Sequence, residues 1–355
     1  MLTALEASAL SCPGEQRAGI VAKLRANLQR EYVWGLLVRS GEALAREAPA
    51  LAALLQRSRD DASLFVDAIP CQQAALVAST CGREDDAGWV AAQVGLALRH
   101  AGVLDPWSVR FRTPRRVRFA AWVSPPLGEL DTAELEDVEA RGWVRLPALA
   151  VQEGSFAVLP NELDEVCPIE APRFRWKPSD AIPDCVAALS TSLDVLARDA
   201  PEYLGWIEHG IHTIVPVDSP PDANVSKSIQ NVDGVVVIGL PADSATLGEL
   251  LVHEASHQLL HLVEPVVAIS NGYDTHQYFS PFARADRDVR RMLLGFHAFA
   301  NIAAYYLRIG GNDADKWLAQ WFPALERSHR AIAMSKGLTP HGRALFEPVA
   351  SLIGL

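Results

Sequence analysis

Residues 249–261 read ELLVHEASHQLLH, and the pattern HEASH occupies positions 253–257. An α-helix advances about 100° per residue, so His253 and His257 lie on the same face of a helix. Both imidazoles can then bind one metal ion, and Glu254, one step round the helix, can reach a water molecule on that ion. The pattern therefore predicts a helix that carries a metal site.

The sequence on either side of this pattern favours a helix that follows a strand. Residues 234–238 read GVVVI, a short β-branched run typical of a strand. Pro241 then ends the run, and Asp243 or Ser244 can cap the helix that follows. The leucines of that helix predict one buried side: they stand at positions 247, 250, 251 and 259. Burying two histidines and a glutamate among them would be costly without a partner.

A catalytic metal needs at least one more protein ligand. One zinc-peptidase pattern places a glycine three residues after the second histidine and a third histidine three residues later, but those positions here are Leu260 and Val263. Another takes a glutamate from a following helix, yet residues 265–325 contain none. The sequence therefore has the two histidines and the glutamate of a zinc-peptidase site but lacks the usual third ligand. The same five-residue pattern also occurs in helices that bind no metal.

Three histidines downstream are candidates for the third ligand. His261 lies on the same helix, but it is two turns from His253 and points in a different direction round the helix axis. His276 falls in a loop, NGYDTHQYF. His297 stands in the apolar run LLGFHAFANIAAYY, on the next long helix, where it could pack across the first. A histidine on such a helix can also be a core residue bonded to a carbonyl, so all three alternatives stay open here.

Arginines crowd the segment SPFARADRDVRR, residues 280–291. Arg290 and His297 are seven residues apart, almost two helical turns, so they share a face. A guanidinium beside a metal can hold a carboxylate through two parallel hydrogen bonds. A co-substrate with two acidic ends, such as 2-oxoglutarate, would fit this arrangement, and Arg290, Arg284 and Arg287 are the candidates for holding it. A solvated helix face with local ion pairs is the simpler alternative.

Composition narrows the class of protein. The chain has 355 residues, a net charge of −11 and 49% hydrophobic residues. An acidic balance argues against a general nucleic-acid binder, because such proteins need a basic surface. The five cysteines are scattered, which favours a reduced, cytoplasmic protein. No signal peptide is expected from the first residues, and no apolar run is long enough to predict a membrane span.

The pattern of the chain predicts an α+β fold that is mainly helical, in three regions. Residues 1–104 are rich in Ala and Leu at helical spacing and predict a helical N-terminal region. Residues 105–180 break into short runs between Pro and Gly and predict a β-rich connecting segment. Residues 181–355 hold the motif and predict the catalytic region, with a small sheet beside the motif helix. Within it, helices are expected from residue 183 and over 286–308.

Several stretches together resemble a known family. LLVHEASHQLL, YFSPFARADRDVRR and GFHAFANIA, preceded by SKSIQNVDGVVVIGLP, are similar to the HExxH-motif peptide-modification proteins. The resemblance covers roughly residues 183–310 and implies a zincin-like catalytic region. It also implies an iron(II)- and 2-oxoglutarate-dependent dioxygenase that uses O₂ to hydroxylate Cβ of a residue in a ribosomally synthesised peptide. The family form of the arginine segment has prolines that this chain lacks.

Carried over to this sequence, the resemblance implies that His253, His257 and His297 bind the iron. An arginine of residues 280–291 would hold 2-oxoglutarate, and Glu254 would orient a ligand or a water molecule. A precursor peptide is the expected partner.

The peptide could lie along the strand before the motif helix by adding to the sheet edge. Ser226 and Ser228 would line its approach. Neither nucleic acid nor a membrane is expected as a partner, and the oligomeric state is open. A zinc metallopeptidase and a non-catalytic peptide-binding protein are the alternative functions.

Overall fold

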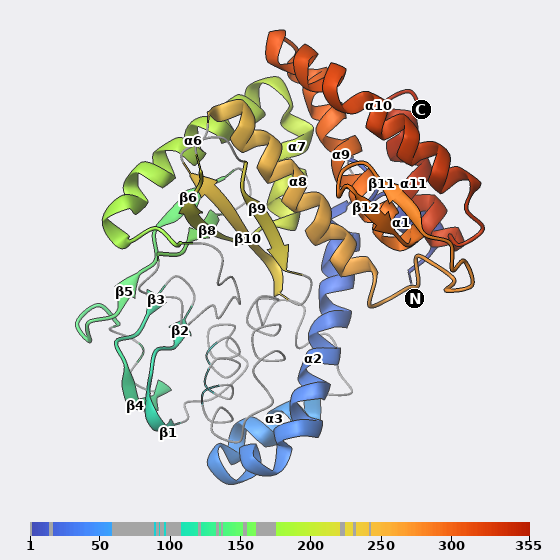
Figure 1. Cartoon of the computed structure of the whole chain (residues 1–355). Helices are drawn as coiled ribbons and strands as arrows, with labels where there is room; N and C mark the ends of the chain where they lie inside the picture. The colour runs from blue at the N-terminus through green and yellow to red at the C-terminus, as the bar shows by residue number, and fades with distance from the viewer. Residues whose placement is uncertain are drawn as a thin grey trace.

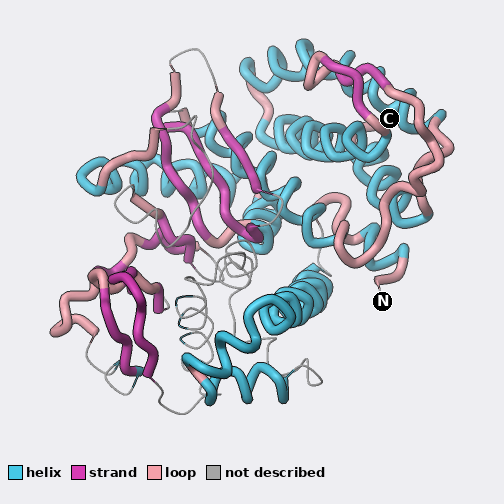
Figure 2. Tube along the Cα trace, turned by 60° about the horizontal axis from the view of Figure 1, so that its bottom comes forward, coloured by secondary structure: helices cyan, strands magenta, loops and turns pink. Residues whose placement is uncertain are grey.

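The computed structural model has a mixed α+β fold that is mainly helical, with a small central sheet, as the sequence predicts. Figure 1 shows the helices of the C-terminal half gathered around one end of this sheet, while the short strands of the middle segment lie at the lower left. Figure 2 shows the same division between helices and strands from a second direction. The structure describes residues 2–13, 17–58, 89, 92, 96, 108–119, 122–132, 135, 138–151, 155–160, 175–220, 224–229, 232–240 and 243–355.

The central sheet has five strands in the order β6-β7-β8-β10-β9. Their bounds are β6 (Ala148–Ala150), β7 (Ser155–Val158), β8 (Thr213–Asp218), β9 (Ser226–Ile229) and β10 (Val232–Leu240). Strand β10 runs parallel to β8 and antiparallel to β9, which forms one edge. The valines and isoleucine of GVVVI are buried on both faces, because helices cover one side and a second apolar cluster the other.

Helices of the C-terminal half build the core against this sheet. Their bounds are α6 (Ile182–Asp199), α7 (Pro201–Gly210), α8 (Ser244–Val263), α9 (Val289–Ile309), α10 (Asn312–Met334) and α11 (Pro340–Leu352). Helix α8 carries the motif; it packs against β9 and β10 on one side and against α6, α7 and α9 on the others (Figure 1). The motif helix is therefore the centre of the fold and not a surface addition.

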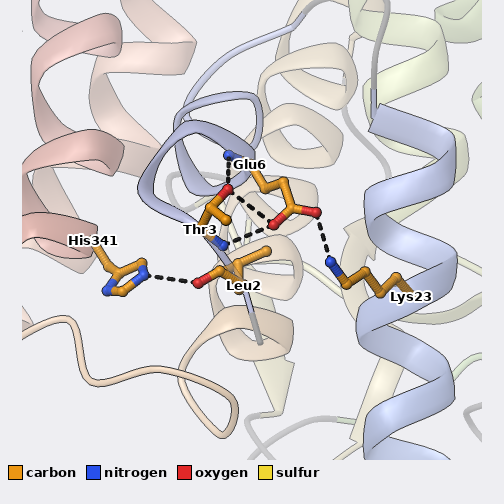
Figure 3. A network of polar contacts seen from close by, with 5 residues as sticks. All are labelled: Leu2, Thr3, Glu6, Lys23 and His341. Carbon is orange, nitrogen blue, oxygen red and sulfur yellow. Dashed lines mark hydrogen bonds and ion pairs between the residues drawn. The ribbon is translucent and has the colours of Figure 1, made fainter.

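The N-terminal helices are α1 (Ala4–Ser8), α2 (Arg17–Glu47) and α3 (Pro49–Ser58). Helix α1 packs on α11 and α2 on α7 and α8 of the C-terminal core, whereas α3 packs on α2. Helix α1 begins with a capping box between Thr3 and Glu6. Lys23 of α2 binds Glu6 at 2.6 Å, and the ring of His341 in α11 lies 2.9 Å from the carbonyl oxygen of Leu2 (Figure 3). The start of the chain is thus fixed between α2 and α11.

The middle segment forms short strands, as predicted. They are β1 (Ser108–Arg115), β2 (Arg118–Phe119), β3 (Trp122–Val123), β4 (Leu127–Asp131) and β5 (Val144–Arg145), in two small sheets apart from the central one. Strands β6 and β7 belong to the central sheet, and Trp176 bridges to Val217 of β8. The boundary predicted at residue 180 therefore divides one sheet. The predicted helical region over residues 59–88 lies outside the described residues.

Two predicted elements differ from the structure. The helix expected from residue 286 begins at Val289, because Asp288 caps it and residues 285–287 pair as strand β12 with β11 (Tyr278–Ser280). Strand β9 was not predicted as a strand; its residues 226–229 pair with β10. In both places pairing with a neighbouring strand, and not the local sequence pattern, decides the structure of the segment.

Within the described ranges, no helix is both long enough and apolar enough to cross a lipid bilayer.

Close packing between α8 and α9 predicts a sensitive position at Gly248. A Cβ there would lie 2.3 Å from the hydroxyl oxygen of Tyr305, whose ring is fully buried on α9. We expect Gly248→Ala to lower the free energy of unfolding by about 1–3 kcal/mol, measured by urea denaturation, because the ring has no free space to enter. Gly205→Ala in α7 is the matched control: nothing lies within 4 Å of its Cβ, so it should be neutral or stabilising by up to about 1 kcal/mol. Equal effects of both substitutions would contradict the packing argument.

Candidate metal centre on helix α8

Helix α8 is positioned at its start and again in its middle. Asp243 caps it as predicted, accepting hydrogen bonds from the backbone N–H groups of Ala245 and Thr246 at 3.0 Å. In the middle, Gln258 binds strand β10 twice: its Oε1 accepts from the N–H of Gly234 at 3.0 Å, and its Nε2 donates to the carbonyl of Val235 at 2.9 Å. Gln258 was not among the residues predicted for the site. Its place four residues after Glu254, on the same helix face, was the available signal.

His253 and His257 meet as the spacing predicts. Their Nε2 atoms are 3.1 Å apart and their rings are nearly perpendicular. Burial lowers the pKa of His253 to about 4, and burial together with the neighbouring His253 lowers that of His257 to about 3. Both rings are therefore neutral at pH 7, the form that binds a metal. The His253 side chain is still 20% exposed, so the pair is open on one side.

The geometry of the pair fits two neighbouring ligands of one metal ion. Ligand nitrogens that each lie roughly 2.0–2.1 Å from the same ion stand about 3 Å from each other. A single N–H···N hydrogen bond between the rings accounts for the same distance. The pair is therefore compatible with a metal without requiring one.

Glu254 points to the sheet side of α8, away from the open side of the pair. It is 2% exposed, and its Oε1 lies 4.0 Å from Nε2 of His253. Burial raises the pKa of Glu254, and hydrogen bonds from the hydroxyls of Ser226 and Ser228 oppose that rise. The structure thus places these two serines, predicted to bind substrate, against the motif glutamate. They alternate along β9, which is why both hydroxyls turn to the same face.

His297 lies in the core on α9. It is fully buried, its ring is 6.0 Å from that of Trp206, and neither ring nitrogen makes a hydrogen bond of ordinary geometry. Burial lowers its pKa to about 4, and weaker hydrogen-bonding contacts with the backbone of Leu10 and Ser11, just beyond α1, oppose that shift. His297 is near enough to His257 to lower the pKa of that ring. Two such nitrogens in a buried ring suit a metal ligand chemically, but the ring faces Trp206 and the N-terminal segment.

The other two candidates for the third ligand differ in their surroundings. His261 stacks on His257, with ring centroids 6.2 Å apart, and burial lowers its pKa to about 4. His276 is exposed in its loop and packs on the ring of Tyr278 at 4.5 Å. Across the described parts of the chain, no group of three or more His, Cys, Asp or Glu side chains is already arranged to hold a metal. The structure therefore brings two of the candidate residues together, His253 and His257, and no third one beside them within the described ranges.

The arginines are not equivalent. Arg290 pairs with Glu264 at the C-terminal end of α8, with Nε 2.6 Å from Oε1 and Nη2 donating to Oε2 at 2.7 Å. Its guanidinium is also close enough to lower the pKa of His261. Arg284, an exposed residue with a positive φ of 51°, and Arg287 on β12 form no ion pair with any residue in the described ranges. The residue with the predicted position is therefore already paired, and the other two are free of acidic partners.

Phe299 completes the immediate surroundings of the pair. Its ring stands edge-on to His253, with centroids 5.4 Å apart, and it stacks on Phe282 at 4.1 Å. The sequence analysis treated this part of α9 only as an apolar helix. The position of Phe299, two residues after His297, gave no signal that it would contact the motif.

The lowered pKa of His297 predicts a loss of stability in acid. The folded ring has a pKa of about 4 against an ordinary value of 6.5, so the unfolded chain takes up a proton that the folded chain refuses. The contribution of His297 to the free energy of unfolding is fully present above pH 6.5. It falls as the pH drops towards 4, by up to roughly 1.4 kcal/mol per pH unit. In metal-free protein, urea unfolding at pH 7, 6 and 5 should show a shallower decline for His297→Gln than for the native chain. Parallel declines would rule out this contribution from His297.

Neither a protein-family model nor a curated protein matches this chain. The resemblance that spans residues 183–310 therefore stays an inference from the motifs themselves.

Proposed function

We propose that this chain is an iron(II)- and 2-oxoglutarate-dependent hydroxylase that acts on Cβ of a residue in a ribosomally synthesised peptide. The observation that carries the proposal is the His253–His257 pair: two neutral imidazoles whose Nε2 atoms are 3.1 Å apart, open on one side. His297 is the proposed third ligand, because a buried imidazole whose nitrogens make no hydrogen bond of ordinary geometry lies on the adjacent helix α9. Binding would require its ring to change its present contacts with Trp206.

The edge strand β9 supports a peptide as the substrate. It ends the five-stranded sheet, so its outer backbone groups have no strand partner within that sheet. An extended peptide can add to such an edge through main-chain hydrogen bonds, which tolerate varied side chains. Because Ser226 and Ser228 of β9 bind Glu254, a peptide on this edge would lie next to the motif. We also propose that residues 181–355 form a zincin-like catalytic region.

Bound iron, 2-oxoglutarate and O₂ would together supply the oxidation of a C–H bond to C–OH, with succinate and CO₂ as the other products. The protein's part is to bind, to orient and to exclude water. The buried Glu254, held by two serine hydroxyls, has a raised pKa and can orient a ligand or a water molecule beside the pair. Phe299 packs against His253 and limits access from the α9 side.

The carboxylate of 2-oxoglutarate would be held by one of three arginines. Arg290 is closest to the row of histidines, since it acts on the pKa of His261, which stacks on His257. Its ion pair with Glu264 would have to be shared with or yielded to the co-substrate. Arg284 and Arg287 have no such competitor in the described part of the chain.

Zinc-dependent peptide hydrolysis is the second candidate, and Glu254 is the observation that favours it. A buried glutamate with a raised pKa, 4.0 Å from a motif histidine, is also suited to act as a general base on a water molecule. Hydrolysis would need no O₂ and would be abolished by Glu254→Gln. A non-catalytic peptide-binding protein is the third reading. It predicts that His253→Ala leaves peptide affinity unchanged.

We place the protein in the cytoplasm as part of the proposal. Cys185 of α6, which lies within the described residues, is a free thiol. Reduced thiols are the ordinary state in that compartment.

The decisive experiment mixes purified protein anaerobically with Fe(II), 2-oxoglutarate and a peptide encoded beside its gene, and then admits air. We expect a gain of about 16 Da in the peptide, the mass of one oxygen atom, with succinate formed in equal amount. His253→Ala and His257→Ala should each lower iron binding and product formation at least a hundredfold, because each removes one of the proposed ligands. His276→Ala, an exposed histidine away from the pair, is the matched control and should behave as the native chain. Peptide cleavage without O₂ would establish the peptidase instead.

The ion pair at the end of α8 predicts opposite effects of two substitutions. If Arg290 holds the co-substrate, Arg290→Lys should raise the KM for 2-oxoglutarate about tenfold or more, because a lysine cannot make the two parallel hydrogen bonds. Glu264→Gln should lower the same KM, since it removes the competing carboxylate. Steady-state succinate formation measures both. If neither KM changes, the co-substrate role passes to Arg284 or Arg287, whose alanine variants test it in the same way.

A further inference from the structure

Glu249 stands on the same face of α8 as the histidine pair, one turn before His253. Residues four apart on a helix differ by only about 40° in direction, so Glu249, His253 and His257 follow one another along one stripe. The proposed function gives no role to this carboxylate. Its position nevertheless makes it the nearest acidic group along the stripe on the N-terminal side of the pair.

Two neutral donors hold the Glu249 carboxylate in place. The hydroxyl of Tyr306 on α9 donates to its Oε2 at 2.7 Å, and the Trp317 side chain on α10 forms a second hydrogen bond with it. Neither donor carries a charge. Among the described residues, the one charged group that acts on Glu249 is Asp243, which is also acidic. The carboxylate is therefore oriented but its charge is not balanced.

An unbalanced carboxylate that is partly removed from water is unfavourable by itself. Burial raises the pKa of Glu249, which shows that ionisation is opposed where the group lies. A positively charged partner would remove this penalty, since the attraction is stronger where water is partly excluded. Glu249 is only partly buried, so part of its side chain is exposed to solvent.

Aromatic rings extend from Glu249 to the histidine pair. Trp317 stacks on Tyr306 at 5.1 Å and lies 6.3 Å from Phe299, the ring that touches His253. Trp321 lies 5.4 Å from Phe299. Phe299 and Trp321 are both partly exposed. The faces and edges of such rings attract a cation and also pack well against the alkyl stem of a long basic side chain.

We propose that Glu249, held by Tyr306 and Trp317, forms with the rings of Phe299 and Trp321 the recognition site for a basic side chain of the substrate, a lysine or an arginine. The carboxylate pairs with the ammonium or guanidinium group, and the two partly exposed rings pack against the stem. This inference rests on the proposed function in taking a peptide as the substrate. It adds that the residue bound beside the histidine pair carries a positive charge.

The test measures binding to metal-free protein, with four capped peptides Ala-Ala-X-Ala-Ala in which X is lysine, arginine, norleucine or glutamate. Titration calorimetry up to 10 mM peptide gives each dissociation constant. We expect the lysine and arginine peptides to bind at least tenfold more tightly than the norleucine peptide, which has a similar stem without the charge. The glutamate peptide should bind most weakly. No binding of the lysine peptide, or binding no tighter than that of norleucine, overturns the proposal.

Glu249→Gln should remove the preference for lysine while keeping the hydrogen bond from Tyr306. Glu326→Gln, which changes an exposed glutamate on α10, is the matched control and should retain it. A preference that survives Glu249→Gln overturns the assignment to this carboxylate. If Glu249→Gln does not fold, Trp321→Ala serves as the second variant, and it should weaken lysine binding severalfold through loss of the ring contact.

The two proposals can fail separately, because this binding needs neither iron nor 2-oxoglutarate. A preference for lysine without any gain of 16 Da would contradict the proposed hydroxylase and support the recognition site. Hydroxylated product with no preference for a basic residue would contradict the recognition site alone.

Discussion

The attachment of helix α8 to strand β10 is the constraint on which the rest of the site depends. Near the start of β10, the side chain of Gln258 takes the place of a neighbouring strand. It accepts a hydrogen bond from the N–H of Gly234 and donates one to the carbonyl of Val235. These bonds fix the rotation of the helix about its axis, because a side chain bonded to a strand at two atoms cannot turn away. With that rotation fixed, Glu254 faces the sheet and the two histidines face away from it, with His253 against Phe299 of α9. Gly234 itself has a positive φ of 69°, which a glycine adopts without strain.

Once α8 is fixed, its outward stripe divides into parts with different electrostatic character. Glu249 at one end is oriented by neutral donors. His253 and His257 in the middle are neutral imidazoles. Glu264 at the other end is matched by Arg290. One helix face thus changes from an unbalanced acid through two neutral imidazoles to a balanced ion pair. A charged ligand that approaches this row of residues meets a different partner at each turn of the helix. The two ends of the row therefore differ in charge.

Local features of the site could be predicted from the sequence, and contacts between distant segments could not. The strand GVVVI, the cap at Asp243 and the meeting of His253 with His257 depend on residues within about ten positions of one another, so patterns of spacing predict them. The pairing of Arg290 with Glu264 joins two helices, and only their packing angle decides it. The surroundings of His297 include Leu10 and Ser11, nearly three hundred positions away. No periodicity carries that information.

The candidate metal centre has two requirements, the protonation state of its imidazoles and their position, and the described structure meets them to different extents. Metal binding requires imidazoles without their second proton, and burial lowers the pKa of His253, His257 and His297 to about 4 or below. All three rings therefore offer a free lone pair at neutral pH, and no proton has to be displaced. Position is a separate requirement, and only the pair on α8 meets it, because two residues on one helix turn need no tertiary contact to meet. His297 depends on how α9 and the N-terminal segment pack. Its two nitrogens make no hydrogen bond of ordinary geometry, so an arrangement that gave them a better partner would be favoured.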